Sequence, residues 1–397
     1  MKIAFASSDG KFVSKHFGNT PSFVIAEADD KKWTYVEKRD NYPACGKDGH
    51  SQESFNASVQ LISDCAVVIC SRIGNFAQVG LRAKNIEPVE KPGFIEDILD
   101  EYVKSFARNE QQKKKNKHPC FDHSAHAKYG RIHLPVSAKC NIKCRFCERN
   151  INADEMRPGA ASQILTPEQA VETLAAALEL CPELTVAGIA GPGDALADNS
   201  AIETFRLVDK KFPQLSKCLS TNGLGLPDKA QELSKLGLKH LTVTVNAVDP
   251  KIGEKIISHI TFNGETMGGQ KAAATLLFRQ LEGIREAVGG GMEVKINTVL
   301  VPGVNSDHIG EIAKTISSMG VKYHNIMPLI PRGEFEKLSP PDCAMIETAR
   351  REAESFLPVF RNCAHCRADA CGIPGVSDVS RKLYKKTGDF RCNNVCG

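Results

Sequence analysis

Three cysteines lie within eight residues, at Cys140, Cys144 and Cys147, shortly after a strand-like run at residues 131–137. Thiolates are the ligands that zinc and iron–sulfur clusters select. Four thiols would close a structural zinc site or hold every corner of a cubane cluster, whereas three leave one metal position open to a reactant. The spacing therefore predicts a metal centre that takes part in chemistry. The alternative is a zinc site completed by a distant Cys or His, which the preceding barrel-like strand and the other thiols of the chain make less attractive.

Composition and charge narrow the class of protein. The chain has 397 residues, enough for two domains, and its hydrophobic (42%) and charged (25%) fractions are ordinary for a globular protein. Its net charge of +4 is too small to indicate a nucleic-acid partner. No run of about eighteen apolar residues occurs, so no membrane span is expected, and the first residues become polar too soon for a secretion signal. Fifteen cysteines without such a signal fit metal ligation in a reducing, cytoplasmic setting better than a disulfide framework.

Residues 1–106 alternate between strand-like and helix-like patterns. We expect strands at residues 2–7, 22–27, 33–38 and 65–71, and helices at residues 51–63, 75–84 and 93–104. This alternation predicts a small α/β domain with its own core. Residues 107–117 are polar, basic and without an apolar period, which predicts a flexible linker.

A second, more regular alternation follows in residues 118–375. We expect strands at residues 131–137, 184–190, 217–220, 240–246, 293–301 and 323–330, separated by helices at residues 167–180, 201–211, 228–236, 266–288 and 307–319. Thr166 and Gln169 form a capping-box pattern at the start of the first helix. Six strands with intervening helices predict a parallel, partial (β/α)6 barrel, whose chemistry would lie at the carboxyl ends of the strands. Residues 376–397 form a tail that carries a cysteine pair.

Polar and glycine-rich motifs fall at these strand ends. Glycines allow a backbone to approach a ligand closely, and Asp194 could accept a hydrogen bond from an amine or a ribose hydroxyl, although a simple tight turn would look the same. Inward-facing polar residues in a barrel are costly without a bound partner. The candidate cofactor-binding residues are Gly191, Pro192, Gly193, Asp194, Ser220, Asn222, Asn246, Asn297 and Met327.

Further thiols flank the predicted barrel. His118 and Cys120 precede it, Cys218 lies in its third strand, and Cys363 and Cys366 follow it. A C-x-x-C pair places two sulfurs for one metal or cluster, with further ligands supplied from elsewhere. A thioredoxin-like redox pair would need a βαβ context that residues 362–372 lack. Cys218 could instead be a buried core thiol.

The C-x3-C-x2-C spacing, with Phe146 before the last cysteine, resembles the signature of the radical S-adenosylmethionine (SAM) superfamily. The resemblance implies that Cys140, Cys144 and Cys147 hold a [4Fe–4S] cluster whose fourth iron chelates the amino and carboxylate groups of SAM. The Gly-Pro-Gly-Asp loop is similar to the loop that binds the methionine amino group in that superfamily.

The region from His118 to about Gly372 resembles the NifB family of nitrogenase cofactor maturases. The matching segments are residues 118–120, 125–126, 131–136, 140–147, 156–159, 165–170, 188–194, 219–224, 246–250, 325–330 and 363–370. The resemblance implies that two substrate [4Fe–4S] clusters, a carbide from a SAM methyl group and an added sulfur become an eight-iron precursor. It also implies an electron donor such as ferredoxin or flavodoxin, and carrier or scaffold proteins that receive the product. By resemblance Cys363 and Cys366 hold one substrate cluster with Cys120, while Cys218, with His118, holds the other.

The first hundred residues resemble the NifX-type cofactor-binding domains. The match covers residues 6–10, 16–18, 45–46 and 64–74. It implies a ribonuclease-H-like fold that carries iron–sulfur cofactor precursors, with His16 and Cys45 as candidate cofactor contacts.

The chain departs from the NifB pattern in three respects. NifB proteins usually have another Cys six residues after the third SAM-cluster Cys, and residues 148–154 contain none. Asn152, Asp154 or Cys371 could substitute, or that substrate cluster could be absent. Cys392 and Cys396 in the tail are unexpected, and the cofactor-binding domain precedes the barrel. Two alternatives therefore stay open: a diverged radical SAM enzyme with another substrate, and a non-enzymatic iron–sulfur carrier.

Overall fold

The computed structural model describes residues 1–43, 45–46, 49–50, 52–115 and 117–384, and the side chains of all of these except 45–52 and 106–115. The chain divides into two compact units, Met1–Lys113 and Lys114–Gly397. Cys392 and Cys396 lie outside the described residues.

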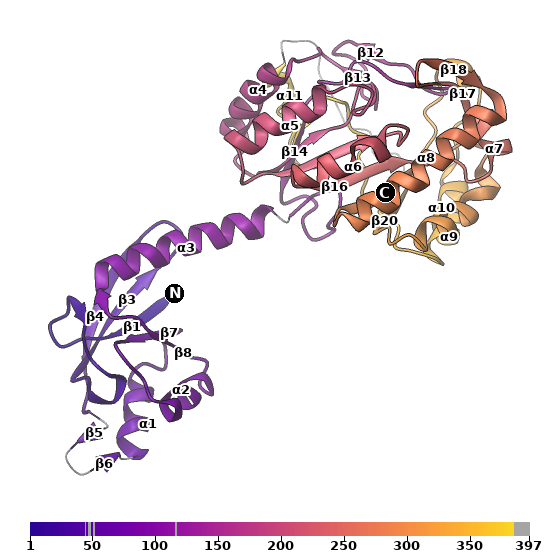
Figure 1. The fold of residues 1–397 in the computed structure, drawn as a ribbon. Coiled ribbons are helices and arrows are strands. Elements are labelled where there is room, and N and C mark those ends of the chain that lie inside the picture. Colours follow the sequence, from indigo (N-terminus) through magenta and orange to yellow (C-terminus); the bar gives the residue numbers. More distant parts are fainter. Residues whose placement is uncertain (44, 47–48, 51, 116, 385–397) are drawn as a thin grey trace. The chain divides into compact units, whose positions relative to one another are not determined.

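The smaller unit is built on a five-stranded sheet in the order β4-β3-β1-β7-β8 (Figure 1). Its central strand β1 is antiparallel to β3 and parallel to β7, so the sheet is mixed. The strands are β1 (Lys2–Ala6), β3 (Ser22–Ala28), β4 (Trp33–Asp40), β7 (Val67–Cys70) and β8 (Glu87–Glu90). This strand order confirms the predicted ribonuclease-H-like α/β fold.

Both faces of this sheet are covered. Alternate side chains of β1 enter two separate cores: Ala4 and Ala6 pack with Leu81 of α2, whereas Ile3 and Phe5 pack with residues of α3. This division follows because successive side chains of a strand point to opposite faces of the sheet. The remaining elements are β2 (Phe12–Val13), η1 (Phe17–Asn19), β5 (Cys45–Gly46), β6 (Gly49–His50), α1 (Gln52–Leu61), α2 (Asn75–Arg82), β9 (Gly93–Phe94) and α3 (Ile95–Lys115).

Helix α3 corrects the expectation of a flexible linker at residues 107–117. The helix continues to Lys115, well beyond the predicted end at residue 104. Residues 107–115 contain no Gly or Pro and consist mostly of Ala, Arg, Glu, Gln and Lys, which are good helix formers. Because this segment has no apolar period, it lacks the usual sequence signal for an amphipathic helix. Its residues nevertheless have a high intrinsic preference for the helix.

The larger unit contains the predicted partial barrel. Six parallel strands lie side by side in chain order, and β21 adds to the free edge of β10 in the antiparallel direction. The strands are β10 (Gly130–His133), β14 (Leu184–Ile189), β15 (Ser216–Thr221), β16 (Leu238–Thr244), β19 (Glu293–Leu300), β20 (Tyr323–Pro328) and β21 (Cys371–Gly372). The sequence did not predict β21, because a strand of two residues is too short to show an alternation of apolar and polar side chains.

Helices connect these strands and pack their apolar faces on the sheet. They are α4 (Pro167–Leu180), α5 (Ser200–Lys211), α6 (Leu226–Lys235), α7 (Pro250–Ile256), α8 (Gly269–Gly289), α9 (Ile309–Ser317), α10 (Cys343–Glu354) and α11 (Ser380–Leu383), with 3-10 turns η2 (Ser306–His308) and η3 (Gly333–Phe335). The capping box of α4 forms as predicted: Thr166 accepts from the Gln169 N–H, and Gln169 accepts from the Thr166 N–H.

A hairpin before α8 corrects the predicted helix start at residue 266. Strands β17 (Ile257–Phe262) and β18 (Glu265–Gly268) are joined by Asn263 and Gly264, both with positive φ (51° and 81°). Asn-Gly is the residue pair that favours such a two-residue turn, so the sequence held this signal. The hairpin matters because β17 also pairs with β11 (Ile142–Cys144), which carries a cysteine of the motif. Two further short strands are β12 (Asn150–Ile151) and β13 (Ala160–Ala161).

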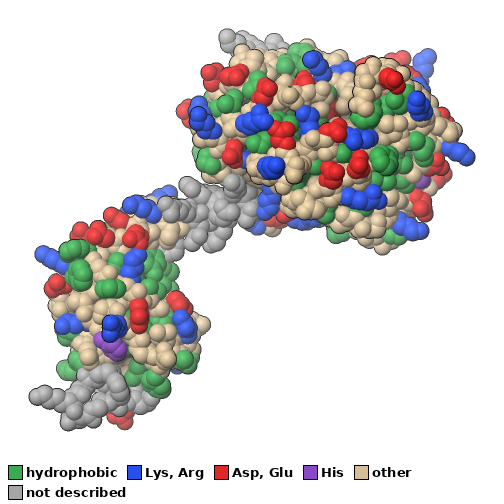
Figure 2. Space-filling model, viewed as in Figure 1, with side chains coloured by type: hydrophobic (Ala, Val, Ile, Leu, Met, Phe, Trp, Pro, Cys, Tyr) green, Lys and Arg blue, Asp and Glu red, His purple; other side chains and the backbone are tan. Residues whose placement is uncertain are grey.

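Charged side chains of both signs are interspersed over the face of the larger unit seen in Figure 2. Within the described part of the chain, we find no helix that has both the length and the apolar character needed to cross a bilayer.

Candidate active site

A cavity of about 360 Å³ lies in the larger unit, and residues of the strands and strand ends line it. Seven free cysteines face it, in two sets. We call Cys140, Cys144 and Cys147 the motif group, and Cys120, Cys218, Cys363 and Cys366 the second thiol group. All eight predicted metal ligands, including His118, thus line one cavity. Ser220, Asn222, Asn246, Asn297 and Met327 line it too, with Pro192, Gly193 and Asp194.

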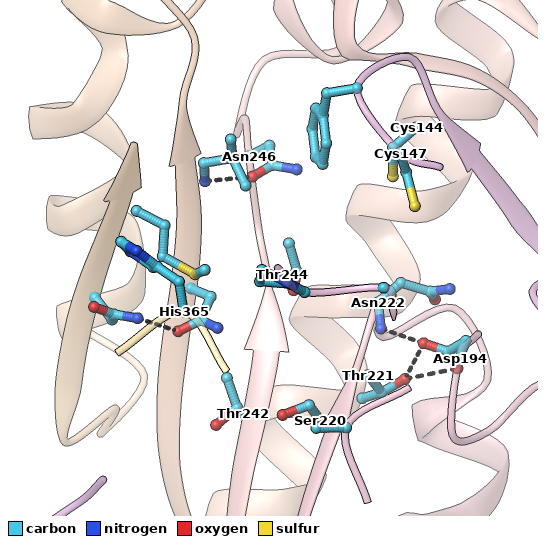
Figure 3. Close-up of a pocket in the computed structure, with 18 of the residues that line it drawn as sticks. Cys144, Cys147, Asp194, Ser220, Thr221, Asn222, Thr242, Thr244, Asn246 and His365 are labelled. Carbon is cyan, nitrogen blue, oxygen red and sulfur yellow. Dashed lines mark hydrogen bonds between the residues drawn. The ribbon is translucent and has the colours of Figure 1, made fainter. Parts of the chain in front are cut away.

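The motif group sits on a loop that the β17–β18 hairpin holds in place. Asn141 O accepts from the Thr261 N–H at 2.8 Å, and the Arg145 N–H donates to Ile256 O at 2.9 Å. Lys143 Nζ donates to the Cys147 carbonyl at 3.0 Å, which closes the loop on itself. Figure 3 shows the Cys144 and Cys147 sulfurs near each other on one side of the pocket. All three cysteines of the motif group line the cavity, so their joint binding of one cluster stays a prediction.

Burial sets the protonation of these thiols. Burial raises the pKa of Cys140 to about 11, and burial together with the neighbouring Cys147 and Cys140 raises the pKa of Cys144 well above its usual value. In the second thiol group, burial raises the pKa of Cys120 to about 11 and of Cys218 to about 12. These thiols hold their protons at neutral pH until a metal centre displaces them.

Asp194 organises the strand ends beside the motif group. Its carboxylate accepts from Thr221 Oγ1 at 3.0 Å, from the Asn222 N–H at 2.5 Å and from the Leu196 N–H at 2.9 Å (Figure 3). The side chain is 4% exposed, and burial raises its pKa despite these donors. Because its acceptor positions are already used, Asp194 holds the loops together. A direct contact with a ligand amine, as expected from the sequence, stays a prediction.

Asn222 continues this network to the cysteine loop. Its Nδ2 donates to Asn141 Oδ1 at 2.7 Å and lies 3.9 Å from Cys140 Sγ, while its Oδ1 accepts from the Leu224 N–H. Asp194, Asn222 and the motif group are therefore joined by hydrogen bonds in one structure.

The glycine at position 193 is explained by the close approach of its backbone to the segment before the cysteine motif. A Cβ on Gly193 would lie 2.0 Å from Lys139 O, and the N–H groups of Gly193 and Asp194 donate to Ser137 O and Lys139 O. Gly191 does not line the cavity. The loop thus presses against the segment that leads into the cysteine motif.

Asparagines further along the sheet support one another. Asn325 Nδ2 donates to Asn297 Oδ1 at 2.9 Å, and Asn246 Oδ1 accepts from the Val299 N–H at 2.9 Å. Each therefore uses part of its hydrogen-bonding capacity within the protein and keeps the rest facing the cavity.

Two buried cations lie beside the second thiol group. Arg131 Nη2 donates to Cys366 Sγ at 2.9 Å, and Lys295 Nζ donates to Cys120 O at 3.0 Å. The residues are 6% and 5% exposed, and within the described part of the chain neither forms an ion pair with a carboxylate. Burial opposes the charge of Arg131, but the neighbouring sulfurs of Cys366 and Cys120 favour it, and the pKa of Arg131 is raised. Buried charges without a counterion are costly, so this site suits an anion.

His118 lines the cavity, and its ring is packed closely by its neighbours. Its ring packs against Phe121 and His240, at centroid distances of 4.8 and 4.5 Å. Nδ1 accepts from the Cys120 N–H at 3.0 Å, which places the proton of the neutral ring on Nε2, and Nε2 is buried without a partner. Burial lowers its pKa well below the usual value. In this arrangement Nε2 is a donor, and its role as a metal ligand stays a prediction.

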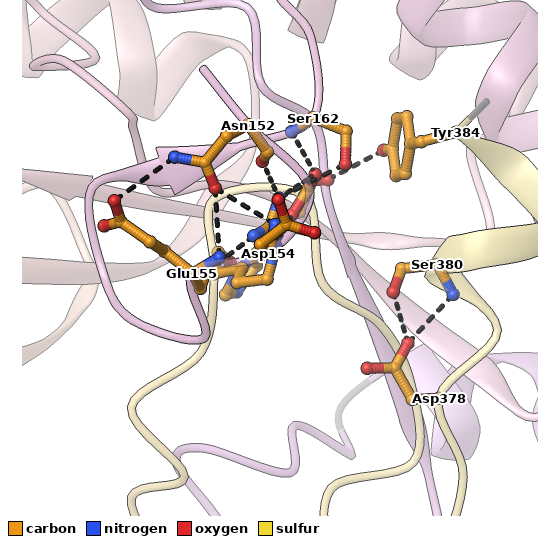
Figure 4. Close-up of polar contacts among 10 residues, drawn as sticks. Asn152, Asp154, Glu155, Ser162, Asp378, Ser380 and Tyr384 are labelled. Carbon is orange, nitrogen blue, oxygen red and sulfur yellow. Dashed lines mark hydrogen bonds and ion pairs between the residues drawn. The ribbon is translucent and has the colours of Figure 1, made fainter. Parts of the chain in front are cut away.

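None of the three residues considered as a substitute for the missing thiol lines the cavity. Asn152 Oδ1 accepts from the N–H groups of Asp154 and Glu155, so Asn152 is used inside its own turn (Figure 4). Asp154 is exposed, and Cys371 is fully buried in β21 within the hydrophobic core. The substitution by these residues that the sequence left open has no support in the structure.

The turn around Asn152 is anchored by a buried ion pair. Arg367 pairs with Asp369 at 2.7 Å and donates to the carbonyl oxygens of Asn152 and Glu155. Asp369 also accepts from the Ser162 N–H. The segment after Cys366 thereby fixes the segment that follows the motif group.

The candidate contacts of the smaller unit are only partly described. His16 caps η1, because its Nδ1 accepts from the Gly18 N–H at 3.1 Å. The backbone of Cys45 lies in β5, but its side chain is outside the described part of the structure. Cys65 and Cys70 are buried core residues of this unit.

Sequence reasoning missed several cavity residues. Lys295 lines the cavity and Arg131 contacts Cys366, and a charge inside a strand pattern was a usable signal for both. His365, Thr242 and Thr244 also line the cavity. Only the fold reveals that these residues face the same space as the cysteines.

The residues present fit an iron–sulfur cluster with SAM. In the described part of the chain no three His, Cys, Asp or Glu side chains are grouped as the ligands of one ion. A cubane binds each thiolate through a different iron, so its ligands need not converge on one point. Three thiols that line one cavity, polar groups beside them and two buried cations next to further thiols match the chemistry of anionic clusters and a small polar ligand.

Two family models match this chain. The model described as dinitrogenase iron-molybdenum cofactor matches residues 1–105, and the radical SAM superfamily model matches residues 134–316. A curated relative, the FeMo cofactor biosynthesis protein NifB of Methanocaldococcus infernus, is 42% identical over 271 residues, which are 68% of this chain and 89% of that protein. The protein of the same name from Klebsiella pneumoniae is 40% identical over 266 residues, 65% of this chain and 57% of that protein. Among solved structures, SuiB of Streptococcus suis aligns with a TM-score of 0.45 and 11% identity, covering 89% of this chain and 71% of that one.

Proposed function

Because this chain belongs to the NifB family of FeMo cofactor biosynthesis proteins, we propose that it builds an eight-iron, carbide-containing nitrogenase cofactor precursor from two [4Fe–4S] clusters, SAM and a sulfur source. The chain is a radical SAM enzyme that uses SAM and an iron–sulfur cluster. The number of clusters and the identity of the product belong to the proposal.

One observation carries the proposal: a single cavity is lined by two separate thiol sets, the motif group and the second thiol group. The reductive cleavage of SAM requires only the first set. Four further cysteines beside buried Arg131 and Lys295 provide soft ligands and positive charge for anionic iron–sulfur substrates.

Each part of the chain has a distinct task in this mechanism. The motif group would hold the SAM cluster, which, when bound, supplies the electron that cleaves SAM reductively. Asp194 and Asn222 keep the cysteine loop against the strand ends, so that SAM is held in one orientation. The barrel walls exclude water from a reactive radical.

The second thiol group would hold the substrate clusters within reach of SAM. Cys363 and Cys366 would bind one, with Cys120, and Cys218 would contribute to the other. The ligands must release the product, and the smaller unit, with His16 and Cys45, would receive it before transfer to carrier or scaffold proteins. Ferredoxin or flavodoxin would supply the electrons.

The first test is anaerobic turnover. Purified, iron-reconstituted protein is incubated with SAM and dithionite, and 5′-deoxyadenosine is measured by chromatography. We expect formation in the wild type and in Cys218→Ala, but iron content and cluster EPR should show fewer clusters in Cys218→Ala. Absence of 5′-deoxyadenosine in the wild type would refute radical SAM chemistry.

A second candidate is a diverged enzyme that binds one substrate cluster. It is favoured by the lack of a thiol at residues 148–154 and by the positions of Asn152, Asp154 and Cys371 away from the cavity. Iron counting separates the two: about twelve irons per chain support maturation and about eight support divergence, at four irons per cubane.

A further inference from the structure

His365 lies between two members of the second thiol group, Cys363 and Cys366, and lines the same cavity. It is half-buried, and within the described part of the chain its ring makes no hydrogen bond. Both ring nitrogens of a half-buried imidazole usually find polar partners. Here the cavity itself is the remaining place for such a partner.

The backbone at His365 is unusual. Its φ is 48°, in the left-handed region, which an L residue adopts at a cost of the order of 1 kcal/mol. Glycine would occupy this position more cheaply. The chain instead places a ring with metal-binding nitrogens at this turn, between two thiols.

The position of the ring distinguishes the two ends of the cavity. In Figure 3, His365 lies across Thr244 and Asn246 from Cys144 and Cys147. The ring is therefore placed for a group held by the second thiol group, and not for the cluster of the motif group.

The residues considered as substitutes for the missing thiol are unsuitable, because Asn152, Asp154 and Cys371 do not line the cavity. His118 does line it and stays a separate predicted ligand, with Nδ1 already occupied. We infer that His365 supplies a nitrogen ligand to a substrate iron–sulfur cluster on the second thiol group. The inference rests on the proposed function, because it requires a cluster there.

The chemistry of imidazole fits this role. A neutral imidazole nitrogen offers a lone pair to a metal, and imidazole replaces thiolate on iron in Rieske centres. A neutral nitrogen adds no negative charge to the site, so it holds the cluster less tightly than a thiolate would. A cluster that must leave as product benefits from such a ligand.

The test uses the full chain with the motif group removed, as Cys140→Ala/Cys144→Ala/Cys147→Ala. This background has no SAM cluster, so no SAM nitrogen contributes to the spectrum. The protein is reconstituted anaerobically with iron and sulfide and reduced, and pulsed EPR measures ¹⁴N coupling to the cluster, with ¹⁵N-histidine labelling to assign it.

His365→Ala and His365→Cys are compared in this background with His259→Ala, which removes an exposed histidine of β17 that does not line the cavity. We expect both His365 variants to lose all or part of the histidine ¹⁴N coupling, while His259→Ala keeps all of it. His365→Cys should retain the iron, which separates a lost ligand from a misfolded chain.

Full histidine ¹⁴N coupling in both His365 variants would overturn the inference and leave the proposed function standing. If the background variant binds no iron, both the inference and the substrate clusters of the proposed function fail. The turnover of SAM by the wild type is a separate measurement, so the radical chemistry is judged independently.

Discussion

The motif group and the second thiol group line the same cavity, but the protein supports them in different ways. Around the motif group, Asp194 and Asn222 are satisfied by hydrogen bonds within the chain. Around the second thiol group, Arg131 and Lys295 are buried and have no carboxylate partner in the described part of the chain. The first side is organised before any ligand binds, whereas the second reaches electrostatic balance only with an anion.

The largest expected effect comes from removing one thiol of the motif group. Cys144→Ala should abolish 5′-deoxyadenosine formation, because the SAM cluster loses a ligand, while iron on the second thiol group is retained. Iron analysis and EPR of the anaerobically reconstituted variant check this. Loss of all iron would show that the two sides are not independent.

A large stability effect is expected from Asp369→Ala. The change leaves Arg367 buried without its partner, and breaking a buried pair costs about 3–5 kcal/mol. Urea unfolding of the larger unit measures it. Asp342→Ala removes only the cap of α10 and is the control, with an expected cost of about 1 kcal/mol. Equal losses in both variants would contradict the role of the pair.

Lys295→Met probes the unbalanced charge directly. The variant keeps the apolar stem but removes the cation, so the iron-free protein should become more stable, while iron binding at the second thiol group weakens about tenfold. Lys251→Met, at an exposed position, is the matched control. Iron titration by absorbance and thermal unfolding give the two readouts, and a decrease in both would contradict the electrostatic interpretation.

Asp194→Asn tests the hydrogen-bond network around the motif group. The amide nitrogen would face an N–H donor such as that of Asn222, and an unsatisfied buried group costs about 1–3 kcal/mol. SAM affinity, measured by equilibrium dialysis with reconstituted protein, should fall, while iron on the second thiol group is unchanged. Unaltered SAM binding would show that the network does not position the ligand.

The smallest effect is on acid stability, and its sign differs between these two aspartates. Burial acts to raise the pKa of Asp369, but Arg367 and Ser162 outweigh it and lower that pKa. Its stabilising contribution is therefore present above the usual aspartate pKa, near 3.9, and is lost as the pH falls through the lower folded value. Burial raises the pKa of Asp194, so its contribution is present at low pH and is lost as the pH rises through the folded value.

Unfolding free energies measured between pH 3 and pH 6, a range chosen about the usual carboxyl pKa, test this difference. Relative to the wild type, Asp369→Ala should lose less stability on acidification, and Asp194→Asn should lose more. Parallel curves for all three proteins would contradict both assignments.

Local patterns in the sequence predicted much of the fold. The apolar period found the six barrel strands, and the capping box placed the start of α4. Errors arose where the apolar period was absent or misleading. Helix α3 continued through a polar segment because of its helix propensity, and the predicted helix at residues 266–288 included most of strand β18. The number and spacing of the cysteines also predicted that the chain uses metal chemistry.

The cysteine spacing by itself determined that three thiols lie near one another, because neighbouring residues stay close however the rest of the chain folds, and it predicted a three-thiol centre there. Only the tertiary structure decided which distant groups share its cavity. It brought Cys120, Cys218 and His365 into one space, placed Cys371 in the core, and set Arg131 against a thiol. Such contacts join residues that are far apart in the chain. They are fixed by the packing of strands and helices, and no local sequence pattern encodes that packing.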